Sequence, residues 1–429
     1  MSNIEIGAVA LLCSILMIGL RFHIGLALGA AAIVGLNFVI GTSATLAVVR
    51  SVPFEFAASW ELSAIPMFLL MGNVAFYTGM TDSLFNAARV WLGRMPGGLA
   101  IATNFSCAGF AAASGSSLAT TIAMGRIAIP EMRKYKYDPG LATGVVAAAG
   151  TLGSLIPPSI LLVIYGIFAE VSVTKLFLAA IIPGILTAAV YAVMIIGRCI
   201  RNPELAPADD QIYTLREKVL ILREIWPLPL LIFAVIGSIY TGIATATEAG
   251  ALGAAMSMVI AMVQRKLTWE NLRNSVAESV ITTGMLFFIA LGAILMVRLM
   301  AFSGLPDFLA DTMSAYAVSP WTLLLMTVVI YLILGCLIDP LGMILLTLPV
   351  FLPMFEASGF DMIWFGILIV KFVEIGLLTP PLGLNVFAVR SLEPDIPLGV
   401  IFKGVSWFLA CEVFVLFLLC VYPQMTQLL

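Results

Sequence analysis

Small polar side chains gather at two places where a long apolar stretch of the sequence is interrupted. The first place carries hydroxyl groups in two neighbouring segments, at Ser114, Ser116, Ser117, Thr151, Ser154 and Ser159. The second place combines a carboxylate, a hydroxyl and an amide with a glycine, at Asp339, Gly342, Thr379 and Asn385. Unwound backbone carbonyls and helix C-terminal ends suit Na⁺, whereas the N-terminal ends of half-helices favour an anionic group. These residue types therefore predict ion binding rather than catalysis.

A double proline lies beside each of these places. Residues 150–159 read GTLGSLIPPS, and residues 376–383 read GLLTPPLG. Proline lacks a backbone donor and clashes with the preceding turn, so helical hydrogen bonding stops there. Within lipid, the freed backbone groups are tolerated only where protein or a water-filled cavity receives them. A matched pair of interrupted helices in the two halves of one chain indicates the binding site of a transporter.

The composition indicates a chain that lies mostly within a lipid bilayer. Of its 429 residues, 62% are hydrophobic and 10% are charged, whereas soluble domains carry about 25% charged residues. We therefore predict an all-α polytopic membrane protein. The sequence has no basic stretch interleaved with aromatic residues, and it lacks the common nucleotide, hydrolase and Cys/His metal motifs. We expect no enzymatic activity, no nucleotide, no transition metal and no nucleic acid.

Apolar runs of about 17–25 residues mark the membrane spans, and they divide the chain into two similar halves. The first half, residues 1–197, contains a re-entrant hairpin at 97–131 and a broken helix at 140–170. Residues 198–224 are the most charged stretch and predict a cytoplasmic linker. The predicted spans outside the hairpins and broken helices are residues 4–20, 24–40, 62–79, 176–197, 226–240, 248–263, 276–300 and 398–422.

The second half, residues 225–429, repeats the plan with a hairpin at 320–356 and a broken helix at 361–390. Surface helices are expected at residues 42–58, 81–94 and 306–317, of which the last two are amphipathic.

One spacing relates the two halves. Pro157 and Pro380 are 223 residues apart, and so are Gly153 and Gly376. Each half has five spans and one hairpin, and an odd number of crossings makes the second half enter from the opposite side. The basic residues agree, because most of them fall inside when the N-terminus lies outside. We therefore expect two inverted repeats whose hairpin tips approach each other near the midplane.

Each singled-out residue also has a simpler explanation. Residues 114–117 could merely let helices pack closely, and Asp339 could cap a helix. Lys371 and Glu374, three residues apart on one helix, could neutralise each other, or Glu374 could act in gating. Arg298 could receive a substrate carboxylate or extend to the outer headgroups. The recurrence of a polar turn beside a double-proline break favours a binding site.

Two other classes of protein fit the sequence less well. A membrane-embedded enzyme such as a polyprenyl-phosphate transferase would need paired acidic or histidine residues at a membrane face, which the sequence does not show. A channel would not require a mobile domain. The absence of a nucleotide motif also means that the energy for transport comes from a gradient or from a partner.

Four motifs resemble one transporter family over essentially the whole chain. They are SGSSLATTIAMGRIAIPEM at residues 114–132, GTLGSLIPPS at 150–159, DPLGMILLTLPVFLP at 339–353 and EIGLLTPPLGLNVF at 374–387. In this order they resemble the large membrane (permease) subunit of tripartite ATP-independent periplasmic (TRAP) transporters. The resemblance implies Na⁺-driven import of small organic acids such as C4-dicarboxylates, sialic acid or other carboxylates.

The resemblance also implies partners, a mechanism and a location. The subunit would work with a separate small four-helix membrane subunit and a periplasmic substrate-binding protein. An elevator mechanism would move a transport domain, built from the hairpins and broken helices, against a scaffold. The chain would be a multi-pass protein of the bacterial cytoplasmic (inner) membrane with a periplasmic N-terminus.

Site residues follow from matching the family motifs to this sequence. The resemblance implies two or more Na⁺ sites, and it places substrate between the hairpin tips. The expected substrate contacts are Ser114, Ser116, Ser159, Arg298 and Asn385. The expected Na⁺ ligands are Ser114, Ser117, Gly150, Thr151, Ser154, Pro157, Asp339, Gly342, Gly376 and Thr379.

Overall fold

A computed structural model describes residues 1–207, 213–315, 319–335 and 338–427. Within these residues the chain is helical and contains no strand, so the predicted all-α class is confirmed. Six helices are long and apolar enough to cross a membrane, or up to eight if each bent pair counts as one span. The chain is thus a multi-pass membrane protein. Five crossings in each half remain a prediction.

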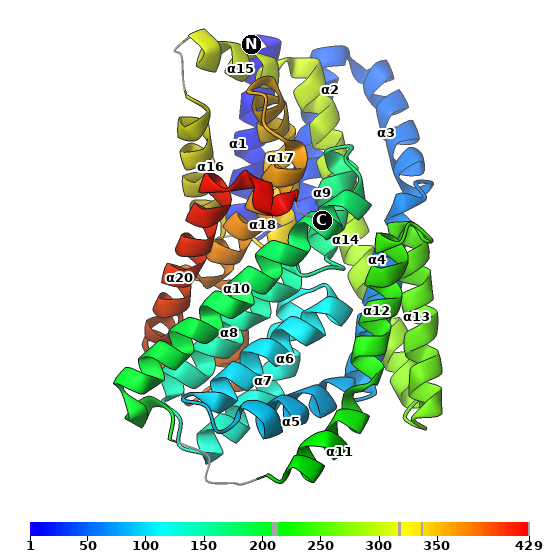
Figure 1. Cartoon of the computed structure of the whole chain (residues 1–429). Helices are drawn as coiled ribbons and strands as arrows, with labels where there is room; N and C mark the ends of the chain where they lie inside the picture. Colours follow the sequence, from blue (N-terminus) through cyan, green and yellow to red (C-terminus); the bar gives the residue numbers. More distant parts are fainter. Residues whose placement is uncertain (208–212, 316–318, 336–337, 428–429) are drawn as a thin grey trace.

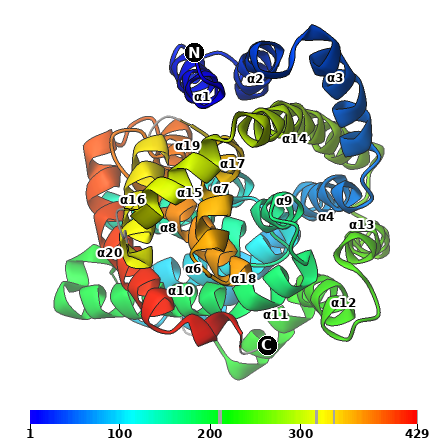
Figure 2. The ribbon, with the colours of Figure 1, turned by 90° about the horizontal axis from the view of Figure 1, so that it is seen from above.

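One group of helices lines one side of the molecule (Figure 2). Within it α2 packs against α1 and α14, and α4 packs against α13 and α14. The short helix η1 (Glu61–Ser63) leads into α4. The bounds of the group are α1 (Asn3–Gly19), α2 (Ile24–Ile40), α3 (Thr42–Ala57), α4 (Ala64–Tyr77), α12 (Pro227–Tyr240), α13 (Ala246–Val263) and α14 (Trp269–Ser303).

A bundle built around α8 fills the other side (Figures 1 and 2). Helix α8 packs against α6, α7, α10, α18, α19 and α20. The bounds of the bundle are α6 (Gly98–Ser114), α7 (Ser117–Lys134), α8 (Pro139–Leu155), α9 (Ile160–Phe168), α10 (Val173–Arg201), α16 (Pro320–Gly335), α17 (Pro340–Ala357), α18 (Met362–Leu378), α19 (Leu384–Leu392) and α20 (Leu398–Val421).

Helix bounds in the bundle repeat at the spacing seen in the sequence. Helices α8 and α18 begin at residues 139 and 362 and end at 155 and 378, so both ends differ by 223. Helices α7 and α17 begin at 117 and 340 and end at 134 and 357, with the same difference. The opposite orientation of the two halves in the membrane stays a prediction.

Side-chain caps explain why these bounds are so regular. The Asp138 carboxylate accepts the Leu141 backbone N–H at the start of α8, and the Asp361 carboxylate accepts the Ile363 N–H at the start of α18. A cap satisfies a donor that has no partner inside the helix, so it fixes the first residue. Because Asp138 and Asp361 cap α8 and α18 in the same way, the two helices begin at corresponding residues of the two halves.

Two amphipathic helices follow glycines in the left-handed conformation. Helix α5 (Met80–Leu92) follows Gly79, with φ of 69°, and α15 (Leu305–Ala315) follows Gly304, with φ of 67°. Helix α11 (Leu215–Ile225) begins within the predicted linker, ends one residue beyond it and packs against α5.

Helix α14 begins earlier than predicted, because the Thr268 side chain caps it by accepting the Asn271 N–H at 3.1 Å. Residues 269–275, which lie before the predicted span 276–300, are therefore part of this helix. Two short helices, η2 (Pro203–Leu205) and η3 (Pro423–Thr426), follow α10 and α20.

Candidate functional site

A cavity of about 170 Å³ lies where both hairpin tips and both broken helices meet. Its walls come from α7, α8, α9, α17, α18 and α19, and from α4 and α14. The polar side chains that line it are Ser116, Ser117, Ser154, Thr282, Asp339 and Asn385. The two polar places predicted from the sequence thus share one cavity, whereas the sequence suggested two similar pockets.

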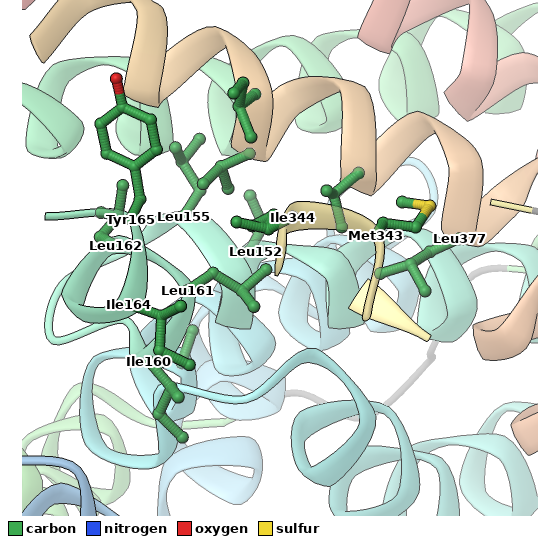
Figure 3. Packing of buried hydrophobic residues seen from close by; sticks show 14 of the residues in the cluster. Leu152, Leu155, Ile160, Leu161, Leu162, Ile164, Tyr165, Met343, Ile344 and Leu377 are labelled. Carbon is green, nitrogen blue, oxygen red and sulfur yellow. The ribbon is translucent and has the colours of Figure 1, made fainter. Parts of the chain in front are cut away.

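Apolar side chains surround this cavity and hold its walls in place. Leu161 of α9 and Leu377 of α18 line it directly. Figure 3 shows these two residues in the same apolar cluster as Leu152, Met343 and Ile344, which are buried. Because α8, α9, α17 and α18 all contribute to the cluster, the two halves are packed together immediately beside the polar residues.

The first hairpin tip is fastened to the first helix break. Gly115, at the tip, has φ of 60°, and its carbonyl accepts the backbone N–H of Ile160 at 3.2 Å. Ser116 caps α7 by accepting the Ala119 N–H at 3.4 Å. Ser159 caps α9, and its hydroxyl also donates to the Ser154 carbonyl within the break. The tip and the break therefore form one hydrogen-bonded unit.

Replacing Gly115 by Ala should disrupt this unit. The left-handed conformation disfavours any side chain by about 1–2 kcal/mol, and a Cβ atom would also collide with the carbonyl of Pro158. We expect a lower thermal unfolding midpoint for the purified chain. Gly399→Ala is the matched control, since a Cβ there has no atom within 4 Å. Equal midpoints for the two variants would show that the tip does not need glycine.

The second hairpin tip is ordered by Asp339. Its Oδ2 atom accepts the N–H groups of Leu341 and Gly342 at 3.2 and 3.4 Å, so Asp339 is the N-cap of α17. The simpler explanation for Asp339, that it caps a helix, is therefore confirmed. Asp339 also lines the cavity, so capping does not exclude ion binding.

A direct polar contact joins the two halves. The Asn385 side-chain amide donates to the Ser117 hydroxyl at 2.8 Å and to the Ala147 carbonyl at 3.1 Å. Asn385 is 0% exposed and Ser117 is 5% exposed. The contact therefore ties α19 of the second half to α7 and α8 of the first.

The N-terminal ends of four helices point their first residues into the cavity. Ser117 begins α7, Ile160 follows the cap of α9, Pro340 begins α17 and Leu384 begins α19. Helix N-termini carry partial positive charge, so they favour anions. At the start of α17 the Asp339 carboxylate already takes this position. Among the described residues that line the cavity, Asp339 is the one charged side chain. The arrangement can accept an anion beside a cation bound near Asp339.

A buried hydroxyl without a partner marks the region between α7 and α8. The Thr121 Oγ1 atom has no hydrogen-bond partner, although the residue is fully buried. It lies against Gly150, where a Cβ atom would collide with it. Thr151 and Ser154 are buried just beyond. An unpaired oxygen here fits the predicted cation region. Thr121 is not among the site residues predicted from the sequence, although it lies one helical turn after Ser117 on the same face of α7.

Several predicted site residues lie near the cavity without lining it. Ser114 shares a hydrogen bond of 2.8 Å with Thr120, and the Thr379 hydroxyl donates to the Ile375 carbonyl. Gly376 is in close contact with Gly335, where α16 and α18 approach each other. Gly342 meets the side chain of Ile24. The glycines thus have a packing role that is visible in the structure.

The two double prolines differ in their surroundings. Pro157 and Pro158 are buried beside α10 and α12, whereas Pro380 and Pro381 are exposed on the isolated chain. The Pro158 carbonyl lies next to the tip glycine of the first hairpin. The first break is therefore enclosed by protein, and the second is open on one side.

Arg298 lies away from the cavity. It is exposed on α14, sixteen residues beyond Thr282, which lines the cavity. At a rise of 1.5 Å per residue, this places Arg298 about 24 Å further along the helix. The resemblance to the family implied a substrate contact for Arg298, and the position of this residue along α14 does not support that contact. Because α14 is long, Thr282 lines the cavity whereas Arg298 lies well beyond it on the same helix.

Known proteins resemble this chain along most of its length. The family model described as "Tripartite ATP-independent periplasmic transporter, DctM component" matches residues 11–425. The C4-dicarboxylate TRAP transporter large permease protein DctM of Pseudomonas aeruginosa is 37% identical, covering 85% of this chain and 84% of the relative. The sialic acid TRAP transporter large permease protein SiaM of Vibrio cholerae is 33% identical, covering 92% and 94%.

A solved structure shares the fold at low sequence identity. The YdaH transporter of Alcanivorax borkumensis aligns with a TM-score of 0.61 and 15% identity, covering 89% of each chain. This likeness concerns the fold alone, whereas the family match and the relatives concern the sequence. On that basis, the chain belongs to the DctM component family of tripartite ATP-independent periplasmic transporters.

Proposed function

We propose that this large permease subunit imports a small organic acid together with Na⁺, and that the acid binds in the cavity between the hairpin tips. The observation that carries the proposal is the convergence of both tips and both helix breaks on one space of about 170 Å³. Relatives are named for C4-dicarboxylate and sialic acid, which are both organic acids.

The acidic group of the substrate would lie at the helix N-termini. The hydroxyl groups of Ser116 and Ser117 and the first turns of α7 and α19 face the cavity, and α19 begins without a side-chain cap. Backbone N–H groups at a helix start bind carboxylates without a basic side chain. Asn385 holds Ser117 in place. It therefore acts by positioning the hydroxyl.

Na⁺ would bind at two regions rich in oxygen atoms. The first region, around the unpaired Thr121 hydroxyl, includes Ser114, Ser117, Gly150, Thr151, Ser154 and Pro157. The second region contains Asp339, Gly342, Gly376 and Thr379. A cation at Asp339 would neutralise the charge that otherwise faces an incoming anion. This dependence of anion binding on Na⁺ is the basis for coupling the two.

Movement of the bundle would carry the cavity across the membrane. The bundle around α8 would be the transport domain, and the group of α1 to α4 with α12 to α14 would be the scaffold. The two halves would be inverted repeats, as the 223-residue spacing of α7 with α17 and of α8 with α18 supports. An interface lined on one side by Leu69, Thr282 and Leu286 would slide past the tips.

The partners would be a small four-helix membrane subunit and a periplasmic substrate-binding protein. The family description names a tripartite periplasmic system, which supports both. The chain would lie in the bacterial cytoplasmic (inner) membrane with its N-terminus in the periplasm.

Uptake into proteoliposomes tests the proposal. The purified large and small subunits are reconstituted, the binding protein is added outside, and accumulation of a radiolabelled organic acid is measured. We expect accumulation only with an inward Na⁺ gradient and with the binding protein present. Uptake that is indifferent to both would indicate a channel, and it would overturn the coupled mechanism.

A further inference from the structure

A second cavity of about 200 Å³ adjoins the one between the tips. The two cavities share Leu69, Ser116, Leu118 and Thr282 in their lining, so they meet at these residues. The second cavity extends between the first hairpin and helices α4 and α14 as far as Glu278. A molecule bound between the tips can therefore extend past Ser116 toward Glu278.

The charges along this space all have the same sign. Asp339 lines the first cavity and Glu278 lines the second, and no Lys, Arg or His lines either one among the described residues. Glu278 is exposed on α14, and its Oε2 atom accepts a hydrogen bond from the Tyr77 hydroxyl at 2.7 Å. The Asn73 amide, also in the second cavity, donates to the Ser279 hydroxyl at 2.9 Å. Glu278 and Asn73 are thus held in place by neighbours.

The two ends of the space suit different chemical groups. The end between the tips has four helix N-termini, which favour an anion. The lining of the end at Glu278 contains a carboxylate and an amide, which favour a hydroxyl, an amide N–H or an ammonium group. Arg126 of α7 acts electrostatically on Tyr77, the hydrogen-bond partner of Glu278, but it does not line either cavity. A second carboxylate at that end would face a like charge, and like charges in contact oppose binding.

We propose that the substrate carries a single acidic group, bound between the hairpin tips, and a hydrogen-bond-donating remainder that extends to Glu278. This inference rests on the proposed function and narrows its substrate class from organic acids in general to mono-anionic ones. Glu278 then acts as a specificity-determining residue, because it rejects dicarboxylates and accepts hydroxy or amino acids of the same length.

Three four-carbon acids that differ only at the second end provide the test. 4-Hydroxybutyrate, 4-aminobutyrate and succinate are titrated, with saturating Na⁺, against the large and small subunits in nanodiscs. The thermal unfolding midpoint reports binding, since a ligand that binds the folded state raises it. Leaving out the binding protein removes its own selectivity from the measurement.

We expect succinate to need a concentration at least about tenfold higher than 4-hydroxybutyrate for the same shift, because of like-charge repulsion at Glu278. Glu278→Gln should reduce this ratio to about threefold or less, since the amide keeps the Tyr77 contact without the charge. Glu270→Gln, an exposed carboxylate on the same helix outside both cavities, should leave the ratio unchanged.

The possible outcomes separate the two proposals. Binding of succinate as tight as that of 4-hydroxybutyrate, or a ratio unaffected by Glu278→Gln, overturns the mono-anionic class while Na⁺-dependent acid binding stands. Failure of all three acids to shift the midpoint at any Na⁺ concentration contradicts acid binding in the cavity, and with it the proposed function.

Discussion

Replacing Lys371 by Met should lower the free energy of unfolding by about 3–5 kcal/mol, the usual cost of removing one partner from a buried ion pair. Lys371 of α18 forms ion pairs with Glu374, at 2.7 Å, and with Glu412 of α20. All three side chains are 0% exposed. Without the ammonium group, two carboxylates would remain buried together with no counter-charge. Thermal or denaturant unfolding of the purified chain in detergent measures the loss.

Two further variants make this prediction specific. Lys403→Met removes an exposed lysine from α20 and should leave the unfolding transition unchanged. Lys371→Met combined with Glu374→Gln and Glu412→Gln removes all three charges, and it should recover much of the stability that the single change loses. If Lys371→Met has the same free energy of unfolding as the wild type, the ion pairs of this cluster do not stabilise the packing of α18 against α20.

The cluster of Lys371, Glu374 and Glu412 shows which contacts can be predicted from the sequence and which cannot. Lys371 and Glu374 are three residues apart, and this local spacing suggested that they could neutralise each other, with a gating role for Glu374 as the alternative. The structure shows the ion pair. Glu412 lies on another helix, and the Tyr191 hydroxyl that donates to it comes from α10. No local pattern connects these residues, because only the packing of α10, α18 and α20 brings them together.

The elements that position the site were predictable because their signals are local. Caps such as Asp138 and Asp361, together with the proline pairs, set where the helices of the bundle begin and end. Contacts across the bundle were not predictable. Thr121 and Glu278 have ordinary helical neighbours in the sequence, and their relation to the cavities appears only once α7 packs on α8 and α14 lies opposite the first hairpin.

Arg298 shows where reasoning from the repeat misleads. Upstream of the hairpins the halves correspond at a spacing of 225 residues, which pairs Arg298 with Asn73. Asn73 does line a cavity. Helix α14 is 35 residues long, whereas α4 has 14 residues. The longer helix puts Glu278 and Thr282, rather than Arg298, at the level of the hairpin tips. Two residues that correspond in the sequences of the halves therefore need not lie at the same level relative to the hairpin tips.

Replacing Asp339 by Asn should raise the Na⁺ concentration needed for half-maximal uptake by about tenfold or more, because an ionised ligand contributes more than a neutral amide to cation binding. Asparagine caps helices as well as aspartate does, so the start of α17 should remain intact. The unfolding midpoint should therefore stay close to that of the wild type. Asp339→Ala should show the same Na⁺ effect and lose about 1 kcal/mol of stability as well, because alanine cannot cap.

Asp361→Asn is the matched control for this change. Asp361 caps α18 as Asp339 caps α17, with its carboxylate accepting the N–H groups of Ile363 and Trp364, but it does not line the cavity. Both aspartates thus have the same local role, and only one of them faces the space between the hairpin tips. If Asp361→Asn and Asp339→Asn change Na⁺ activation equally, or if neither changes it, capping is the whole role of Asp339. A change confined to Asp339→Asn would instead assign its charge to Na⁺ coupling.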